Sequence, residues 1–224
     1  MSTVNSGRPV WSRLAHHRGW SVPLALGAIA AVSVTHLIDF GVYHLRYWIF
    51  NANSAASWSH GVVAGVLGIG AVVCLAGARR LPRQRTAWLA TGVILALFFV
   101  GEISELHAEI DSLSRLLYAP VLAVLVYCVW QLTRGGAQFD VIRASAALLV
   151  ASYAIHVLEP GNIADAFGWT AGGWASQVVV ALKEGTELAG VLLALLALWG
   201  AAAATAQTAD GAPFAAQVRA REGR

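Results

Sequence analysis

Charged residues are scarce in this chain of 224 residues, because Asp, Glu, Lys and Arg together make up only 12% of it. An average soluble domain carries roughly 25% charged residues, so too little charge is present to cover a water-exposed surface. Hydrophobic residues make up 58%, which also excludes a disordered chain, since disordered segments are poor in apolar residues. The composition predicts an integral membrane protein.

Cysteine and lysine are also scarce in this chain. The only two cysteines, Cys74 and Cys128, each lie inside an apolar segment, which excludes a disulfide framework and a CxxC metal site. Lys183 is the only lysine, and the other 14 basic residues are arginines in short clusters between apolar segments. That distribution is typical of membrane topology and excludes a nucleic-acid-binding surface. The lipid bilayer is the partner that it predicts.

Six apolar segments have the length of a membrane span, which needs roughly 20 residues. The stretches 1–20 and 201–224 flank them as tails. We therefore expect an all-α integral membrane fold, a six-transmembrane helical bundle within residues 21–200. The predicted spans are 21–47, 58–78, 87–109, 114–133, 141–159 and 173–200.

The arginines also predict an orientation. Twelve of them fall in the tails and in the loops on one side, whereas only Arg46 and Arg115 fall on the other. The positive-inside rule then places both termini in the cytoplasm (N-in/C-in) of a multi-pass inner-membrane protein. Tryptophans, which favour the headgroup zone, form two belts in the same arrangement. The expected inner belt is Trp20, Trp88, Trp130 and Trp199, and the outer belt is Trp48, Trp58, Trp169 and Trp174.

Ionisable residues inside the spans are the main functional signal, because each costs ~2.5–3.5 kcal/mol or more near the bilayer centre. Four spans carry a pair of them three residues apart, a spacing that places both side chains on one helix face. All of them fall in the outer half of the predicted bundle, whereas the inner halves read as Leu, Val, Ala and Gly. The pairs are His36/Asp39, Glu102/Glu105, His156/Glu159 and Glu184/Glu187, and His60 lies at the outer start of a fifth span.

A metal site is the first interpretation of these residues. Two histidines and up to six carboxylates on four helices are similar in ligand chemistry to di-iron and di-manganese carboxylate bundles. Those bundles use ExxH, whereas the order here is HxxE or HxxD. Zinc would need only a smaller set such as His36, Asp39 and His156. We expect divalent metal ions to be bound by residues of this group: His36, Asp39, His60, Glu102, Glu105, His156, Glu159, Glu184 and Glu187.

The sequence favours a metal-dependent membrane enzyme, a hydrolase or an oxidoreductase, that takes a small-molecule or lipid substrate from the outer side. The reason is that a carrier should continue its polar path inward past Glu187. The alternative is a proton- or cation-coupled transporter, because chains of His and Glu carry protons in membrane pumps. A retinal protein attached through Lys183 is a third hypothesis, weakened by the lack of a seventh span. Ordinary buried ion pairs, such as Lys183 with Glu187, are a fourth.

Overall fold

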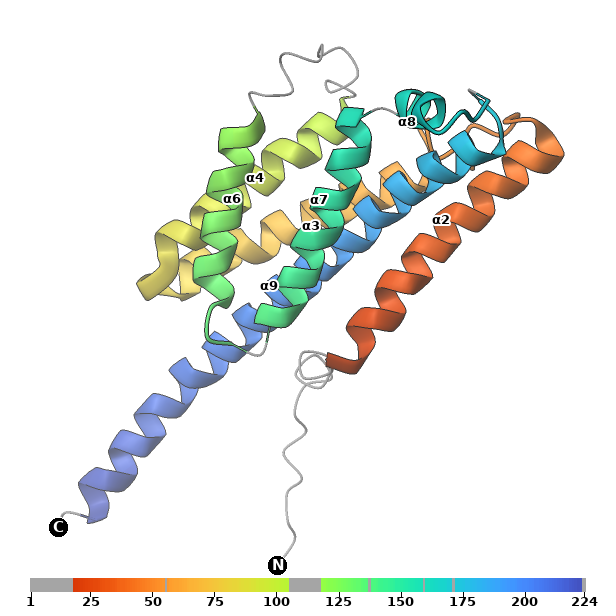
Figure 1. The fold of residues 1–224 in the computed structure, drawn as a ribbon. Helices are drawn as coiled ribbons and strands as arrows, with labels where there is room; N and C mark the ends of the chain where they lie inside the picture. Colours follow the sequence, from red (N-terminus) through yellow and green to blue (C-terminus); the bar gives the residue numbers. More distant parts are fainter. Residues whose placement is uncertain are drawn as a thin grey trace, which may run out of the picture.

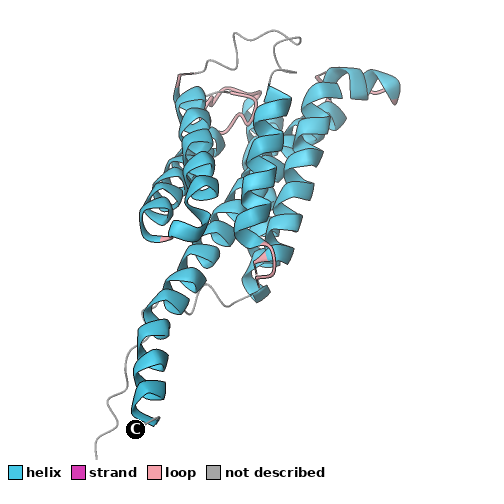
Figure 2. Ribbon diagram, turned by 90° about the vertical axis from the view of Figure 1, so that its left-hand side faces the viewer, coloured by secondary structure: helices cyan, strands magenta, loops and turns pink. Residues whose placement is uncertain are grey.

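The computed structural model describes residues 18–54, 56–104, 118–136, 138–158, 160–170 and 172–222, and all regular structure in these ranges is helical (Figure 2). Between the long helices lie connections that include two short 3₁₀ turns, η1 and η2. The elements are η1 (Arg18–Trp20), α2 (Ser21–Tyr43), α3 (Trp58–Arg80), η2 (Pro82–Gln84), α4 (Arg85–Ile103), α6 (Tyr118–Thr133), α7 (Phe139–Leu158), α8 (Pro160–Ala166) and α9 (Trp174–Glu222).

Five of these helices are long and apolar enough to cross a membrane. A shorter apolar stretch, Pro120–Thr133 of α6, covers most of the predicted span 114–133, whose first residues lie outside the described ranges. Large apolar side chains such as Val72 and Val150 are about two-thirds exposed, which fits contact with lipid. The prediction of a helical membrane-embedded protein is confirmed. The five helices are Ser21–Tyr43, Trp58–Arg80, Arg85–Ile103, Phe139–Leu158 and the part Trp174–Thr205 of α9.

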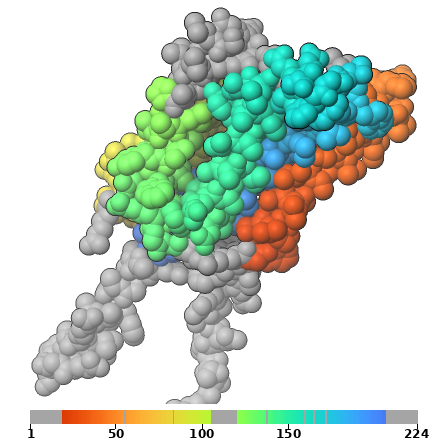
Figure 3. Space-filling model, viewed as in Figure 1, coloured from red at the N-terminus to blue at the C-terminus, as the bar shows by residue number. Residues whose placement is uncertain are grey.

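Helix α9 is the common packing partner of the bundle. It packs against α2, α3 and α7, and α3 packs in turn against α4 (Figure 1). In the space-filling view α6 and α7 lie side by side, and α9 is visible between α7 and α2 (Figure 3). The buried face of α9 carries Leu188, Ala189, Leu193, Ala197 and Leu198, all at most 2% exposed. Residues that bring charge to α9 are thereby placed at the centre of the molecule.

Two glycines of α9 allow this close packing. A Cβ atom at Gly185 would lie 3.0 Å from the Cα of Ile29 on α2. A Cβ atom at Gly190 would lie 2.7 Å from Cγ of Leu149 on α7. Close backbone approach through small residues is the usual means of helix association in lipid, where burial from water supplies no driving force.

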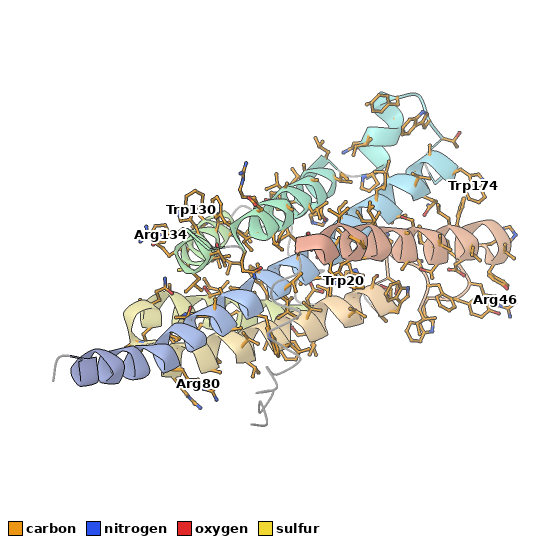
Figure 4. The ribbon with its side chains drawn as sticks, turned by 90° about the horizontal axis from the view of Figure 1, so that it is seen from below. Trp20, Arg46, Arg80, Trp130, Arg134 and Trp174 are labelled. Carbon is orange, nitrogen blue, oxygen red and sulfur yellow. The ribbon has the colours of Figure 1, made fainter. Side chains whose placement is uncertain are left out.

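The bundle has two ends that carry different connections. The connection between α2 and α3 and the short helix α8 lie at the upper end in Figure 1, and the turns between α3 and α4 and between α6 and α7 lie at the lower end. Seen from below, Arg80, Trp130 and Arg134 lie toward one side, and Arg46 and Trp174 toward the other (Figure 4). Trp20, which the tryptophan pattern places in one belt with Trp130, lies between these two groups in the same view.

Two sequence expectations need correction. The predicted span 21–47 ends at Tyr43, because His44 and Leu45 both adopt the left-handed conformation (φ 55° and 59°) and turn the chain. The sequence also leads us to expect that Trp88 faces the headgroup zone, whereas its side chain is fully buried inside the protein. Gly77 of α3 leaves room for that indole, whose Cδ2 lies 2.8 Å from the place a Cβ atom would occupy.

Candidate functional site

A group of four ionisable side chains joins α3, α4 and α9. The imidazole of His60 lies between two carboxylates: its Nδ1 is 3.3 Å from Oε2 of Glu102, and its Nε2 is 3.3 Å from Oε2 of Glu184. The other oxygen of Glu184, Oε1, accepts a hydrogen bond of 2.6 Å from Nζ of Lys183. We name the set His60, Glu102, Glu184 and Lys183 the His60 bridge.

Local structure at the start of α3 holds the ring of His60 in place. The Ser57 hydroxyl caps the helix by accepting a hydrogen bond from the backbone N–H of His60, with the two atoms 3.4 Å apart. Two residues before His60, in the same turn, Nε1 of Trp58 donates to Oγ1 of Thr35 at 3.1 Å. Helix α3 therefore begins at a fixed position against α2, and His60 faces the interior on its first turn.

The His60 bridge must hold a shared proton. A neutral imidazole has one N–H and one lone pair, so it can donate to only one of the two carboxylates. The second contact is favourable only when the ring is an imidazolium or when Glu102 or Glu184 is itself protonated. The side chains are 4–18% exposed, and charges in such surroundings interact far more strongly than in water. The geometry therefore describes a buried proton-binding centre.

Glu187 extends the polar group along α9 and across to α7. It lies three residues after Glu184, on the same face of the helix. Its Oε2 accepts a hydrogen bond of 3.4 Å from the hydroxyl of Ser152 on α7. His156 lies one turn further along α7 on the face of Ser152 and is half-buried.

A second polar group lies at the upper end, between α2, α9 and the connection from α2 to α3. Nδ1 of His36 accepts a 3.0 Å hydrogen bond from the backbone N–H of Ala52. That bond fixes the tautomer, so the N–H at Nε2 donates to Oε1 of Gln177 at 2.9 Å. His36 is completely buried. We name His36, Ala52 and Gln177 the His36 clamp.

Asp39 shapes the same connection from the last turn of α2. Its Oδ1 accepts from the backbone N–H of Tyr47 at 3.1 Å, and its carbonyl oxygen accepts from the N–H of His44 and of Leu45. Its Oδ2 is buried and has no hydrogen-bond partner among the described residues. The pair His36/Asp39 thus organises a loop, whereas His60 joins the helices.

The structure brings together only part of the predicted ligand set. His60, Glu102 and Glu184 meet, and Glu187 follows on α9. Glu105 and Glu159 lie outside the described residues. Within the described ranges no group of three or more His, Cys, Asp or Glu side chains is arranged to hold a metal ion. Metal binding by this set therefore stays a prediction.

The direction of the ring nitrogens explains that outcome for the histidines. The two nitrogens of His60 point at different carboxylates, and both nitrogens of His36 already have protein partners. A histidine ligand must offer a free lone pair toward a point that it shares with other ligands. In this arrangement neither ring does so.

Several polar residues escaped the sequence analysis because they are uncharged. Gln177 lies seven residues before Glu184, two helical turns along the same face of α9, and this spacing could have identified it. Ser152, four residues before His156, carries the same kind of signal. Towards the lower end, the hydroxyl of Ser145 is buried and donates to the carbonyl of Gly190 at 2.7 Å.

The lower half of α4 contributes two more buried polar atoms. Oγ1 of Thr91 and Nε1 of Trp88 are buried, and neither has a hydrogen-bond partner in the part of the chain that the structure describes. The two residues are three apart and share a helix face. The lower half of the bundle is therefore less uniformly apolar than its Leu, Val and Ala content indicates.

Comparison of the chain with family models, curated proteins and solved structures gives no match.

Proposed function

We propose that this chain is a proton-translocating membrane protein and that the His60 bridge is its proton-binding centre. One observation carries the proposal: the ring of His60 lies at hydrogen-bond distance from Glu102 on one side and from Glu184 on the other. A proton can pass between ring and carboxylate here without a large movement of any heavy atom. Chains of His and acidic side chains are the usual proton relays of membrane pumps and transporters.

Charge balance supports a role in binding and releasing a proton. Glu102 and Glu184 supply two negative charges, and Lys183 supplies one positive charge. A single proton on the trio of His60, Glu102 and Glu184 makes the His60 bridge neutral. Its loss leaves one negative charge in a medium of low dielectric constant, which favours prompt rebinding or transfer to a neighbour.

Polar groups continue from the His60 bridge in both directions. Upward along α9 lies Gln177 with the His36 clamp. Downward lie Glu187 and Ser152, and beyond them the buried polar atoms of Ser145 and Thr91. This weakens the reason for which the sequence favoured an enzyme, namely that the inner half lacked polar groups.

The topology that we propose remains six spans, with α6 as the short one and both termini in the cytoplasm. The upper end then faces outward and carries Arg46, whereas Arg79, Arg80, Arg85 and Arg134 lie at the cytoplasmic end. Protons would reach the His60 bridge from outside through the region of the His36 clamp.

Reporter fusions test this orientation. A reporter that is active only outside the cytoplasm is expected to be active at Ser54 and silent at Gln84 and Gly136. The physical reason is the retention of clustered arginines on the cytoplasmic side. Alkaline phosphatase activity, normalised to the amount of each fusion, is the measurement. The opposite pattern would reverse the proposed direction of proton entry.

Proton flux into liposomes tests the function. Purified protein is reconstituted with a pH-sensitive dye inside the vesicles, and a potassium diffusion potential, negative inside, drives protons inward. We expect the wild-type lumen to acidify faster than that of empty liposomes. Glu184→Gln keeps the shape of the side chain but removes its charge, and we expect flux to fall about tenfold or more, as losing ~1.4 kcal/mol or more of stabilisation does.

Asp165→Asn is the matched control, because it also neutralises a carboxylate but at an exposed position on α8. Its flux is expected to equal that of the wild type. The proposal fails if wild-type vesicles acidify no faster than empty ones at potentials of either sign. It also fails if Glu184→Gln conducts as well as Asp165→Asn does.

A metal-dependent membrane enzyme, a hydrolase or an oxidoreductase, is the second candidate. It is favoured by the collection of carboxylates from α4 and α9 around one imidazole in a largely buried site. Metal analysis of protein purified without chelators distinguishes the metal-dependent enzyme from the proton-translocating protein. A stoichiometric divalent metal, such as iron, manganese or zinc, that is lost in His60→Ala and kept in Asp165→Asn would favour the enzyme.

A further inference from the structure

We propose that the His36 clamp is a pH-sensitive lock, which holds the α2–α3 connection closed over the upper end of the bundle and releases it when His36 is protonated. The inference rests on the proposed function, because it assigns a regulated entrance to the same proton-binding centre. It is carried by the hydrogen bonds of one buried ring. Its test reads the movement of the connection and needs no proton flux.

The connection is a folded segment held down by a buried attachment point. The described residues 44–54 and 56–57 turn back on themselves, and the N–H of Trp58 donates to the carbonyl of Ile49 at 3.0 Å. Ala52 lies at the middle of the segment and is only 2% exposed. Its N–H donates to Nδ1 of His36, so the ring of a membrane helix holds the connection from below.

The polarity of this bond makes it sensitive to protonation. A backbone N–H can only donate, so Nδ1 of His36 must present its lone pair to Ala52. A second proton on the ring has only Nδ1 available, because Nε2 already carries the N–H that faces Gln177. Protonation therefore places an N–H at Nδ1 opposite the backbone N–H of Ala52. The two donors repel each other, and the hydrogen bond that holds Ala52 is lost. A side chain of similar shape that accepts from Ala52 but cannot be protonated would keep this hydrogen bond at every pH.

Burial opposes a positive charge on His36 while the connection is closed, and nearby charged groups offset part of that cost. Asp39 on α2 and Glu184 on α9 are the carboxylates whose charges act on it. Glu184 also faces His60 of α3 and Lys183 of α9, so its charge is shared, whereas Oδ2 of Asp39 has no partner in the described ranges. The ionisable side chains of the connection itself, His44 and Arg46, are exposed.

Backbone strain adds to the tendency to open. His44 and Leu45 follow one another in the left-handed conformation, which is unfavourable for residues with a Cβ atom. Their N–H groups are held by the carbonyl of Asp39, and the N–H of Tyr47 is held by its carboxylate. Opening relieves this strain. It uncovers His36 and Gln177 first and leads towards Glu184, two turns further along α9.

Hydrogen–deuterium exchange of the amide of Ala52 tests the lock in full-length protein in lipid nanodiscs. Exchange is compared at about pH 5 and about pH 8, the range in which histidines titrate, after correction for the intrinsic pH dependence of amide exchange. In the wild type we expect the corrected rate to rise about tenfold at the lower pH, because opening exposes the amide. In His36→Asn the side-chain oxygen can still accept from Ala52 and cannot be protonated, so the rate should not change with pH.

His44→Asn is the matched control, since it removes an exposed histidine of the same connection, and its exchange should follow the wild type. A wild-type rate independent of pH overturns the proposal, as does a rise in His36→Asn that equals the wild-type rise. If His36→Asn does not accumulate, the wild-type and His44→Asn profiles decide. A pH-dependent connection in protein that carries no proton flux would leave the lock standing and remove the proposed function. Proton flux in a protein whose connection stays protected at both pH values would leave the proposed function standing and overturn the lock.

Discussion

Replacing His60 with alanine is expected to lower the free energy of unfolding by about 3–5 kcal/mol, as is usual when one partner of a buried charged group is removed. The imidazole separates Glu102 from Glu184, and each carboxylate has one oxygen 3.3 Å from it. Without the ring, two carboxylates in a largely buried site lose their common partner, and only Glu184 keeps a contact with Lys183. Unfolding of the detergent-solubilised protein by sodium dodecyl sulfate, followed by tryptophan fluorescence, measures the change.

A second substitution shows whether charge or packing causes that loss. Adding Glu184→Gln to His60→Ala removes one of the two unpaired charges, so the double variant should be more stable than His60→Ala alone. If packing alone mattered, the second substitution would add its own cost to the first. A fully stable His60→Ala protein would show that water already solvates both carboxylates and that no buried proton-binding centre exists.

Replacing Gly185 with leucine is expected to reduce stability by about 3 kcal/mol or more, at the upper end of the range for overpacking. A Cβ atom at Gly185 would meet the Cα of Ile29 at 3.0 Å and its carbonyl oxygen at 3.3 Å. Both atoms belong to backbone, so helix α2 itself must move away from α9. Thermal unfolding and the fraction of monodisperse protein in size-exclusion chromatography measure the result.

Gly65→Leu is the matched comparison for this substitution. Gly65 lies in the middle of α3, and nothing lies within 4 Å of the place where its Cβ atom would be. Leucine is a better helix former than glycine by up to ~1 kcal/mol, so this variant should be neutral or slightly more stable. Equal losses at Gly65 and Gly185 would contradict the close contact between α2 and α9.

The membrane nature and most of the helices were predictable, because composition and run length alone determine whether a segment suits lipid. The end of α2 was not predictable in this way. The span predicted from the sequence extends to Tyr47, but hydrogen bonds to the carbonyl and carboxylate of Asp39 turn the chain at His44. Such a turn depends on contacts made in three dimensions and leaves little trace in hydropathy.

The candidate site was predictable in its members but not in their grouping. Spacing of three residues correctly places Glu184 and Glu187 on one face of α9, yet it says nothing about which helix that face meets. His60, which has no partner at that spacing, proves to be the residue that joins three helices. The partner of His36 is a backbone N–H of Ala52, and a backbone donor has no sequence signature.

The central position of α9 has a consequence for the biogenesis of the protein. Helices leave the ribosome in chain order, so α2, α3 and α7 are all made before the helix that packs against each of them. Until α9 is inserted, α2 must remain in the bilayer or in the insertion machinery with His36 and Asp39 lacking their final surroundings. Contacts between such distant parts of a chain form late. Chains that stall before α9 will therefore expose these polar faces to lipid, and we expect them to be removed by membrane proteases.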